Sequence, residues 1–306
     1  MSSTEVDDEV CANCGKAAVD DIKLKFCTAC KLVKYCSVDC QKNHRPQHKK
    51  ACKKRAAEIR DDQLFRQPDE SHLGECPLCC LPLPLDPSKF WVASCCCKHL
   101  CIGCEYANKN REREQGLEHK CPYCREPLSK SDKENKKNHM KRVKANDPIA
   151  LCELGKEYRD EGDYNRAFQY FTKAAELGHA DAHFEVSILY QLGQGVGKDE
   201  KKRVYHLEEA VIGGHPLARC SLGYEEMSKG RHDRATRHFI IAANLGLDDA
   251  LEAMKKGFQR GIVSKEDYEV ALRGHQAAVD ATKSEQREEG YAFDNFKGMM
   301  FHLGGV

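Results

Sequence analysis

Residues 76–124 carry three Cys-x-x-Cys pairs and, between the first two, a further cluster of metal-binding side chains. The pairs are Cys76/Cys79, Cys101/Cys104 and Cys121/Cys124, and the cluster reads Cys95-Cys96-Cys97-Lys98-His99. Two thiolates separated by two residues can hold one metal ion from a single turn, and two such pairs complete a tetrahedral zinc site. The three pairs and two residues of the cluster supply enough ligands for two ions. The stretch therefore predicts a small fold built around two structural metal sites.

A second cysteine-rich stretch lies closer to the N-terminus. Its candidate ligands are seven cysteines and one histidine: Cys11, Cys14, Cys27, Cys30, Cys36, Cys40, His48 and Cys52. His48 and Cys52 are four residues apart, so both lie on one face of a helical turn and can reach one ion. This spacing favours His48 over His44. A segment this short buries too little apolar surface to fold unaided, and zinc contributes on the order of 10 kcal/mol per structural site.

Composition limits the classes of partner and compartment. The 306 residues carry 49 Lys and Arg against 48 Asp and Glu, a net charge of +1, so no global field attracts nucleic acid or a membrane. Residues 1–10 are acidic, are expected to be disordered, and hold no apolar run that could act as a secretory signal. No stretch approaches the roughly 18 apolar residues of a membrane helix. We therefore expect a reducing compartment, the cytoplasm or the nucleus, where paired cysteines bind metal rather than form disulfides.

The C-terminal half repeats itself. Residues 174–182, 210–218 and 242–250 superpose at periods of 36 and 32 residues, and a period in this range is typical of a helical solenoid. Apolar residues follow the helical period on each unit's two helices, as at Leu151 and Leu154. We expect the second helix of each unit to end at a conserved position of the repeat, occupied by Gly178, Gly214 and Gly246. A glycine-rich insertion at 193–199 lengthens the middle unit's turn, and a degenerate fourth unit runs from Ala250 to about residue 282.

Residues 11–52 closely resemble a MYND zinc finger. The resemblance implies two interleaved zinc sites, one held by Cys11, Cys14, Cys36 and Cys40 and the other by Cys27, Cys30, His48 and Cys52. Members of this family bind short proline-containing peptides in a shallow groove. Gln41 matches a residue of the peptide-binding members, whereas Arg45 stands where those members commonly have a groove-lining tryptophan.

Residues 74–128 resemble a RING finger, whose ligand pairs alternate between two zinc ions. The resemblance implies one site of Cys76, Cys79, Cys101 and Cys104 and another of Cys121, Cys124 and two residues of the cluster. The commonest RING pattern fits Cys97 and His99 only in part, because Leu100 alone separates His99 from Cys101. All-cysteine members leave four residues before the fifth ligand, which favours Cys95 and Cys96, with Cys97 and His99 as alternatives.

The RING family acts mainly in ubiquitin transfer, without a covalent intermediate of its own. By resemblance, Leu78 and Pro122 are expected to dock a ubiquitin-conjugating enzyme, and Arg125 to orient it by donating hydrogen bonds to two acceptors. The segment 105–120, where active members usually offer a bulky apolar contact, is almost wholly polar. The resemblance implies no catalytic residue that would become acylated.

The repeats resemble Sel-one-like repeats, relatives of the tetratricopeptide repeat, which present surfaces to other proteins. The predicted fold class is multidomain: two small zinc-stabilised α+β modules with cross-brace ligands, followed by an all-α solenoid of helix-turn-helix repeats. Expected parts are a disordered N-terminus (1–10), a MYND-type finger (11–52), a linker (53–73), a RING-type finger (74–128), a basic linker (129–147), the solenoid (148–283) and a tail (284–306).

The leading functional hypothesis is a RING-type ubiquitin ligase with four structural Zn²⁺ ions, whose solenoid recruits substrate and whose MYND-like finger contacts a peptide. The alternative is a non-catalytic scaffold or adaptor. Basic runs at 42–55 and 130–144 are read as solvated helix faces or linkers, and nucleic acid is disfavoured because the first run has no aromatic residue for stacking. A methyltransferase is set aside because the signature residues of a SET domain are absent. The tail, with the apolar stretch 299–301, is expected to dock on the solenoid or stay loose.

Overall fold

The structure is a computed structural model that describes residues 10–19 and 23–293. It divides into two compact units, residues 1–66 and residues 67–306. No helix of the described part of the chain combines the length and the apolar character needed to cross a bilayer.

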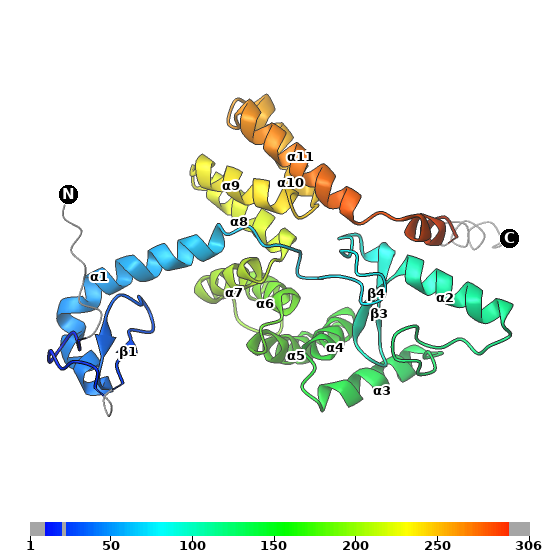
Figure 1. Ribbon diagram of the computed structural model, residues 1–306, viewed down its shortest axis with the longest axis horizontal. Coiled ribbons are helices and arrows are strands. Elements are labelled where there is room, and N and C mark those ends of the chain that lie inside the picture. Colours follow the sequence, from blue (N-terminus) through cyan, green and yellow to red (C-terminus); the bar gives the residue numbers. More distant parts are fainter. Residues whose placement is uncertain (1–9, 20–22, 294–306) are drawn as a thin grey trace. The chain divides into compact units, whose positions relative to one another are not determined.

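The first unit holds a short antiparallel strand pair and one long helix (Figure 1). Strand β1 (Lys25–Phe26) pairs with β2 (Lys34–Tyr35), and α1 (Val38–Leu64) follows, with the Ser37 hydroxyl accepting a hydrogen bond from the Cys40 N–H. The buried residues of this unit's core are mostly metal-binding cysteines, joined by Tyr35. The core is therefore small, as expected for a segment that depends on metal.

Helix α1 extends beyond the predicted finger. Residues 53–64 belong to α1, so the first half of the segment predicted as a linker is helical. The linker prediction was based on the lack of an apolar period, but exposed helices need none where helix-forming residues are dense. Lys53-Lys-Arg-Ala-Ala-Glu58 is such a run.

The second unit begins with a cysteine-rich part. A 3₁₀ turn (Pro87–Lys89) leads into β3 (Phe90–Ala93), which pairs antiparallel with β4 (Lys98–Cys101) and places Trp91 opposite Leu100. Helix α2 (Ile102–Glu114) follows at once, and α3 (Asp132–Val143) leads to the repeats. Leu83, Ala93 and Leu100 are buried with cysteines in this part's own core.

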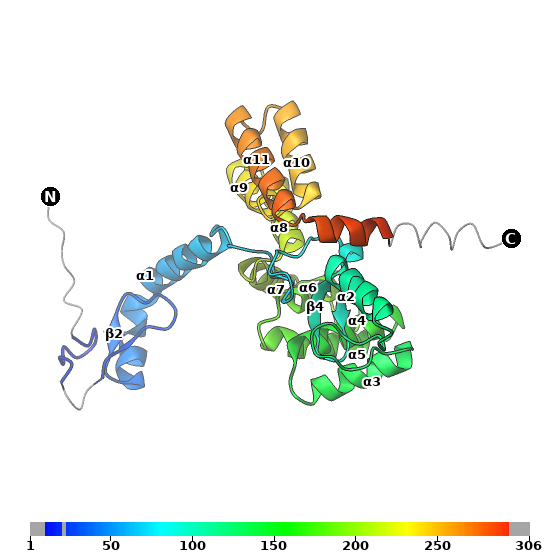
Figure 2. The same cartoon turned by 45° about the vertical axis from the view of Figure 1, so that its right-hand side comes forward.

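The repeats form a solenoid of eight helices within the described residues, stacked in successive antiparallel pairs (Figure 1). Their bounds are α4 (Pro148–Asp160), α5 (Tyr164–Glu176), α6 (Ala180–Leu192), α7 (Glu200–Ile212), α8 (Pro216–Ser228), α9 (His232–Ala243), α10 (Asp248–Gln259) and α11 (Lys265–Ala281). Figure 2 shows the degenerate last pair, α10 and α11, side by side.

Two features show how the repeat sequence produces this stacking. The glycines that follow α5, α7 and α9 have left-handed φ angles of 83°, 80° and 88°, as predicted for Gly178, Gly214 and Gly246. Within the first and third pairs a glycine faces a buried phenylalanine. A Cβ at Gly155 or Gly223 would lie 2.6 Å from the ring of Phe171 or Phe239. The absence of a side chain is what lets the paired helices approach this closely.

Candidate metal centres and interaction sites

The structure brings sixteen side chains together in four groups of four, with the ligand atoms of each group within 4.8 Å of one another. In the first unit, site 1 is Cys11, Cys14, Cys36 and Cys40, and site 2 is Cys27, Cys30, His48 and Cys52. In the second unit, site 3 is Cys76, Cys79, Cys101 and Cys104, and site 4 is Cys95, Cys96, Cys121 and Cys124. Each site takes ligands from two segments that alternate along the chain, the arrangement that both resemblances imply.

The geometry of the groups fits tetrahedral zinc. Six Sγ–Sγ pairs within the sites lie between 3.4 Å (Cys95 to Cys124) and 3.9 Å (Cys96 to Cys121) apart, and none of the cysteines forms a disulfide. Four sulfurs at the usual Zn–S bond length would stand about 3.8 Å apart. In site 2 the Nε2 atom of His48 lies 3.2 Å from Cys30 Sγ, whereas His44 instead hydrogen-bonds the Tyr35 hydroxyl. Four protein ligands fill a tetrahedral shell, so these are structural zinc sites.

Four of the Cys-x-x-Cys pairs share one backbone turn. After each pair the next residue has a left-handed φ angle, and its N–H donates to the carbonyl of the pair's first cysteine at 2.8–2.9 Å. These residues are Gly15, Lys31, Cys80 and Arg125. The turn points both thiolates to one side. Cys80 belongs to no tetrad, but it forms part of this turn, because its left-handed backbone lets its N–H donate to the Cys76 carbonyl.

The remaining pair, Cys101 and Cys104, is positioned by a helix start instead. Cys101 is the N-cap of α2, and its Sγ accepts a hydrogen bond from the Cys104 N–H at 3.4 Å. A thiolate at this position is favoured by the positive end of the helix dipole.

The cluster at 95–99 divides between metal and packing. Cys95 and Cys96 lie in the turn between β3 and β4 and contribute to site 4. Cys97 has a φ of 54° and is buried away from the tetrads, where burial raises the pKa of its thiol to about 12. His99 packs edge-on against Phe90 at 5.6 Å between ring centroids, and burial lowers its pKa. Neither alternative ligand stands in a metal group.

Arg125, predicted to contact a conjugating enzyme, also has partners within the unit. Its guanidinium pairs with the buried Glu112 carboxylate at 2.9 Å and donates to Asn108 Oδ1 at 3.0 Å, both on α2. Burial raises the pKa of Glu112, but hydrogen bonds from His119 and Arg125 outweigh it and the net shift is downward. The Arg125 side chain is 44% exposed to solvent. Leu78 is 38% exposed.

Sequence reasoning missed one charged residue beside site 3. Arg287 lies in the helical residues 285–293, is 1% exposed, and donates to Cys79 Sγ (3.3 Å) and to the carbonyls of Pro82 (2.7 Å), Leu81 (3.0 Å) and Thr282 (2.8 Å). Nothing local in the sequence marks this arginine, because three of its four partners (Cys79, Leu81 and Pro82) lie more than 200 residues earlier.

Neighbouring residues of the tail complete the contact with site 3. Gln286 Nε2 donates to the Gly103 carbonyl (3.1 Å) and contacts Cys104 Sγ (3.6 Å). A Cβ on Gly103 would come within 2.7 Å of the Arg287 backbone. Figure 2 shows this segment, in red, against the start of α2. Residues 285–293 therefore dock on the cysteine-rich part, not on the solenoid as one alternative predicted, and the stretch 299–301 lies outside the described residues.

A further polar group, His72, Asp181 and His215, also comes within 4.8 Å. Hydrogen bonds account for Asp181 and His215, and the His72 ring stacks on His215 with 4.1 Å between ring centroids. His215 Nδ1 accepts the Ala218 N–H at 3.2 Å, so its Nε2 carries the proton and donates to Asp181 at 3.3 Å. Lys156 pairs with the other carboxylate oxygen at 2.8 Å. Burial raises the pKa of Asp181, but these partners lower it well below the usual value. The group ties α4, α6 and α8 together.

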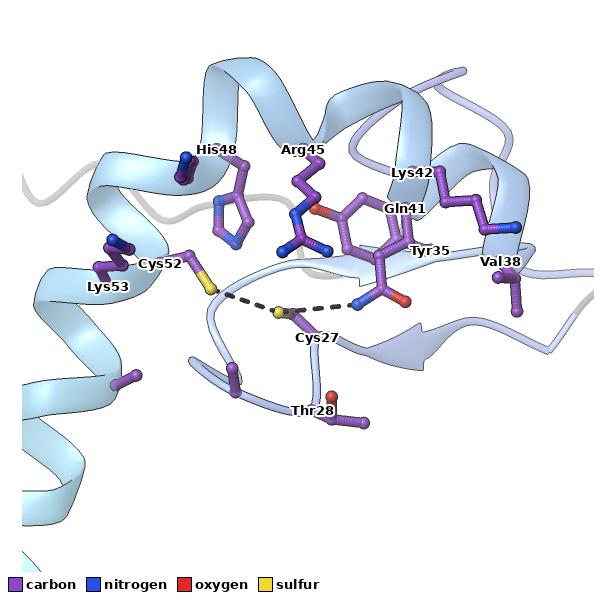
Figure 3. A pocket seen from close by; sticks show the side chains of 13 residues that line it. Cys27, Thr28, Tyr35, Val38, Gln41, Lys42, Arg45, His48, Cys52 and Lys53 are labelled. Carbon is purple, nitrogen blue, oxygen red and sulfur yellow. Dashed lines mark hydrogen bonds between the residues drawn. The ribbon is translucent and has the colours of Figure 1, made fainter. Parts of the chain in front are cut away.

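The first unit has a groove beside site 2 with a volume of about 500 Å³. It lies between the turn at residues 27–29 and the face of α1 (Figure 3). Gln41 and Arg45 both line it, and Gln41 Nε2 lies 3.9 Å from Cys27 Sγ. The two residues singled out from the MYND resemblance therefore share one cavity.

Comparisons with known families match two parts of the chain. Residues 11–52 match the MYND finger, and residues 148–179 and 180–215 match the Sel1 repeat. These matches confirm the predicted finger and the predicted repeats in those ranges. The chain thus combines a MYND zinc finger with helical repeats of the Sel1 type.

Individual relatives match only in part. The chain is 41% identical over 56 residues to DAP3-binding cell death enhancer 1 of Rattus norvegicus, covering 18% of this chain and 11% of that protein. It is 28% identical over 122 residues to an uncharacterized protein of Neisseria meningitidis serogroup B, covering 40% and 26%. The matched part thus spans about a tenth of the length of the rat protein and about a quarter of the length of the Neisseria protein. A crystal structure of a Sel1 repeat protein from Oxalobacter formigenes is 25% identical, with a TM-score of 0.43, and covers 58% of this chain and 72% of that one.

Proposed function

We propose that this protein is a RING-type ubiquitin ligase in which residues 74–128 dock a ubiquitin-conjugating enzyme and the Sel1 repeats recruit the substrate. The observation that carries the proposal is the alternation of sites 3 and 4 around the β3–β4 hairpin and α2. Two interleaved ions make one rigid platform on which docking residues keep fixed positions. The MYND finger contributes a second protein contact, and the protein works in the cytoplasm or the nucleus.

The proposed roles require exposed side chains at three positions. Leu78 offers an exposed apolar contact inside the first Cys-x-x-Cys turn of site 3, and half-buried Pro122 occupies the corresponding turn of site 4. Arg125 retains exposed guanidinium surface while Glu112 and Asn108 hold it in place. Catalysis would consist of orienting the thioester of the conjugating enzyme, since no residue here needs to be acylated.

A non-catalytic adaptor is the second candidate, and the Arg125 contacts favour it. A guanidinium that already serves a buried carboxylate and an amide has fewer donors left for a partner. The face of α2 that meets Arg125 presents Asn108 and Glu112 rather than a bulky apolar side chain. In this alternative Arg125 is a clamp between the last zinc turn and α2.

An autoubiquitination assay against a panel of conjugating enzymes separates the two candidates. We expect chain formation by the zinc-loaded protein, and its loss in Leu78→Ala and Arg125→Ala. Leu192→Ala and Arg113→Ala are matched controls, because Leu192 is 53% exposed and Arg113 bonds Asn110 on α2 without reaching a zinc turn. Silence across the panel from protein shown to contain four zinc ions would refute the ligase and leave the adaptor.

A further inference from the structure

The groove of the first unit has an apolar floor and a basic wall. Its apolar lining comes from Ala29, the ring of Tyr35 and Val38 at the start of α1. The basic side chains follow further along α1, as Figure 3 shows for Lys42, Arg45 and Lys53. Tyr35 is only 4% exposed, and its hydroxyl hydrogen-bonds His44 Nδ1 at 3.0 Å. The floor therefore offers shallow apolar contact, and its aromatic ring presents little surface.

Four cations line the wall, and none of the described residues that line the groove is acidic. Lys42, Arg45, Lys49 and Lys53 follow one another at spacings of three or four residues, which places them on a single face of α1. All four are exposed, and none has an ion-pair partner among the described residues. Figure 3 shows the Arg45 guanidinium over the groove between His48 and Tyr35.

Such a row of cations is unusual because it is uncompensated. Like charges at helical spacing repel one another by a few tenths of a kcal/mol per pair. Further along the same helix, Arg55 has a carboxylate partner, Glu58, at 3.2 Å. Lys50 and Lys54, which do not line the groove, also have no ion-pair partner among the described residues, but the four groove cations share one face of α1, where an anionic ligand would relieve their repulsion.

The dimensions fit an extended peptide. Lys42 to Lys53 span about 16 Å of helix axis. An extended chain covers this length with about five residues, and alternate side chains point to the same side. Acidic residues at alternate positions could therefore face the cations while the intervening residues face the apolar floor. Peptide recognition commonly pairs acidic motifs with clusters of basic side chains in this way.

We propose that the groove binds an extended acidic peptide segment of a partner protein, with Arg45, Lys49 and Lys53 pairing its carboxylates. Single-stranded nucleic acid fits less well, because base stacking needs exposed aromatic faces and Tyr35 is buried. The inference rests on the MYND finger being a protein-interaction module. It is independent of ubiquitin transfer.

The test uses the full-length zinc-loaded protein and two fluorescent peptide pools with a central proline and randomised apolar residues. One pool carries glutamates at alternate positions, and the other carries glutamines in their place. We expect the glutamate pool to bind and the glutamine pool to bind at least about tenfold more weakly. Binding of the glutamate pool should weaken as salt rises, because the pairs are exposed.

Two double variants with the same change in charge test the position of the cations. Lys49→Ala/Lys53→Ala removes two groove residues, whereas Lys50→Ala/Lys54→Ala removes two exposed lysines that do not line the groove. The first should weaken binding by about two- to thirtyfold, the range for two exposed ion pairs, and the second should leave binding unchanged within error. Zinc content measured by native mass spectrometry shows that both variants fold.

Four outcomes would overturn the proposal. Equal loss in the two double variants would mean diffuse attraction to a basic helix, and equal binding of the two pools would mean that carboxylates are not recognised. Tighter binding of an oligothymidylate than of the glutamate pool would assign the surface to nucleic acid. Tenfold tighter binding after deletion of residues 1–9 would assign the groove to the chain's own acidic segment. If the protein shows no ligase activity but none of these four outcomes is observed, the ligase proposal fails and the acidic-peptide site is still supported.

Discussion

Replacing Arg287 by methionine tests whether the C-terminal segment is part of the zinc-binding unit. Methionine keeps an unbranched apolar stem but removes every donor. The carbonyls of Pro82 and Thr282 would lose the hydrogen bonds they accept from Arg287, whereas the Leu81 carbonyl would still accept one from the Cys76 N–H. Cys79 Sγ would lose its contact with a cation.

The expected magnitude follows from these contacts. A zinc ion with four thiolates carries a formal charge of −2, and the buried guanidinium neutralises half of it. Removing an outer partner of a metal ligand typically lowers metal affinity by about 10- to 100-fold, which corresponds to about 1.4–2.7 kcal/mol. Two partly buried carbonyls left without these donors add a cost of up to about 1–3 kcal/mol each to the docking of the tail. We therefore expect zinc at site 3 to be held more weakly and residues 285–293 to detach.

Cysteine alkylation followed by peptide mass spectrometry reads each site separately. In the presence of a zinc chelator, the site 3 cysteines of Arg287→Met should be alkylated about 10- to 100-fold faster than those of the unaltered protein. Sites 1 and 2 serve as internal standards. Arg273→Met is a matched control, because the Arg273 side chain is 69% exposed on α11 and should leave all four sites unchanged.

A second variant tests the same contact through the backbone. Gly103→Ala would place a Cβ 2.7 Å from the Arg287 backbone and should also expose the tail to proteolysis while leaving the Arg287 side chain intact. Equal alkylation rates at site 3 in Arg287→Met and the unaltered protein would refute the reasoning. So would protection of the tail in both variants.

Three further predictions concern the repeats and the metal. Gly195→Ala should lower the free energy of unfolding by at least about 2 kcal/mol, because φ is 67° and the Cβ would meet the Tyr164 backbone at 2.1 Å, whereas Gly197→Ala has open space and should change little in urea unfolding. Asp181→Asn should cost about 1–3 kcal/mol near neutral pH. Because the folded pKa of Asp181 is lowered, its contribution is present above the unfolded pKa of about 3.9 and is lost as pH falls through the folded pKa, so the two proteins should converge in stability in acid. Chelation of zinc should abolish hydrogen-exchange protection around all four sites but leave α4–α9 protected, and loss of protection throughout the repeats would contradict their separate core.

The sequence by itself determined the elements whose signals are local. Spacing along the chain marks the Cys-x-x-Cys turns, because two thiolates separated by two residues can reach one ion in any context. Helical period and the glycines at 178, 214 and 246 predicted the helix pairs and their ends, since a left-handed cap acts within one turn. Local rules failed where helix propensity replaced an apolar period, at residues 53–64 of α1 and at α3 (Asp132–Val143), which occupies most of the predicted basic linker 129–147.

Tertiary structure decided what depends on partners far away in the chain. Which residues of the 95–99 cluster face a metal was set by the β3–β4 turn, where the left-handed Cys97 turns its thiol away from the tetrads. In the sequence, Arg287 is one charged residue within a polar segment. Only the fold brings it to Cys79, 208 positions earlier. The row of cations on α1 reads as a solvated face until the turn at 27–29 closes a groove over it. Burial and ion pairing depend on which distant residues the fold brings together, and the order of residues along the chain does not specify these contacts.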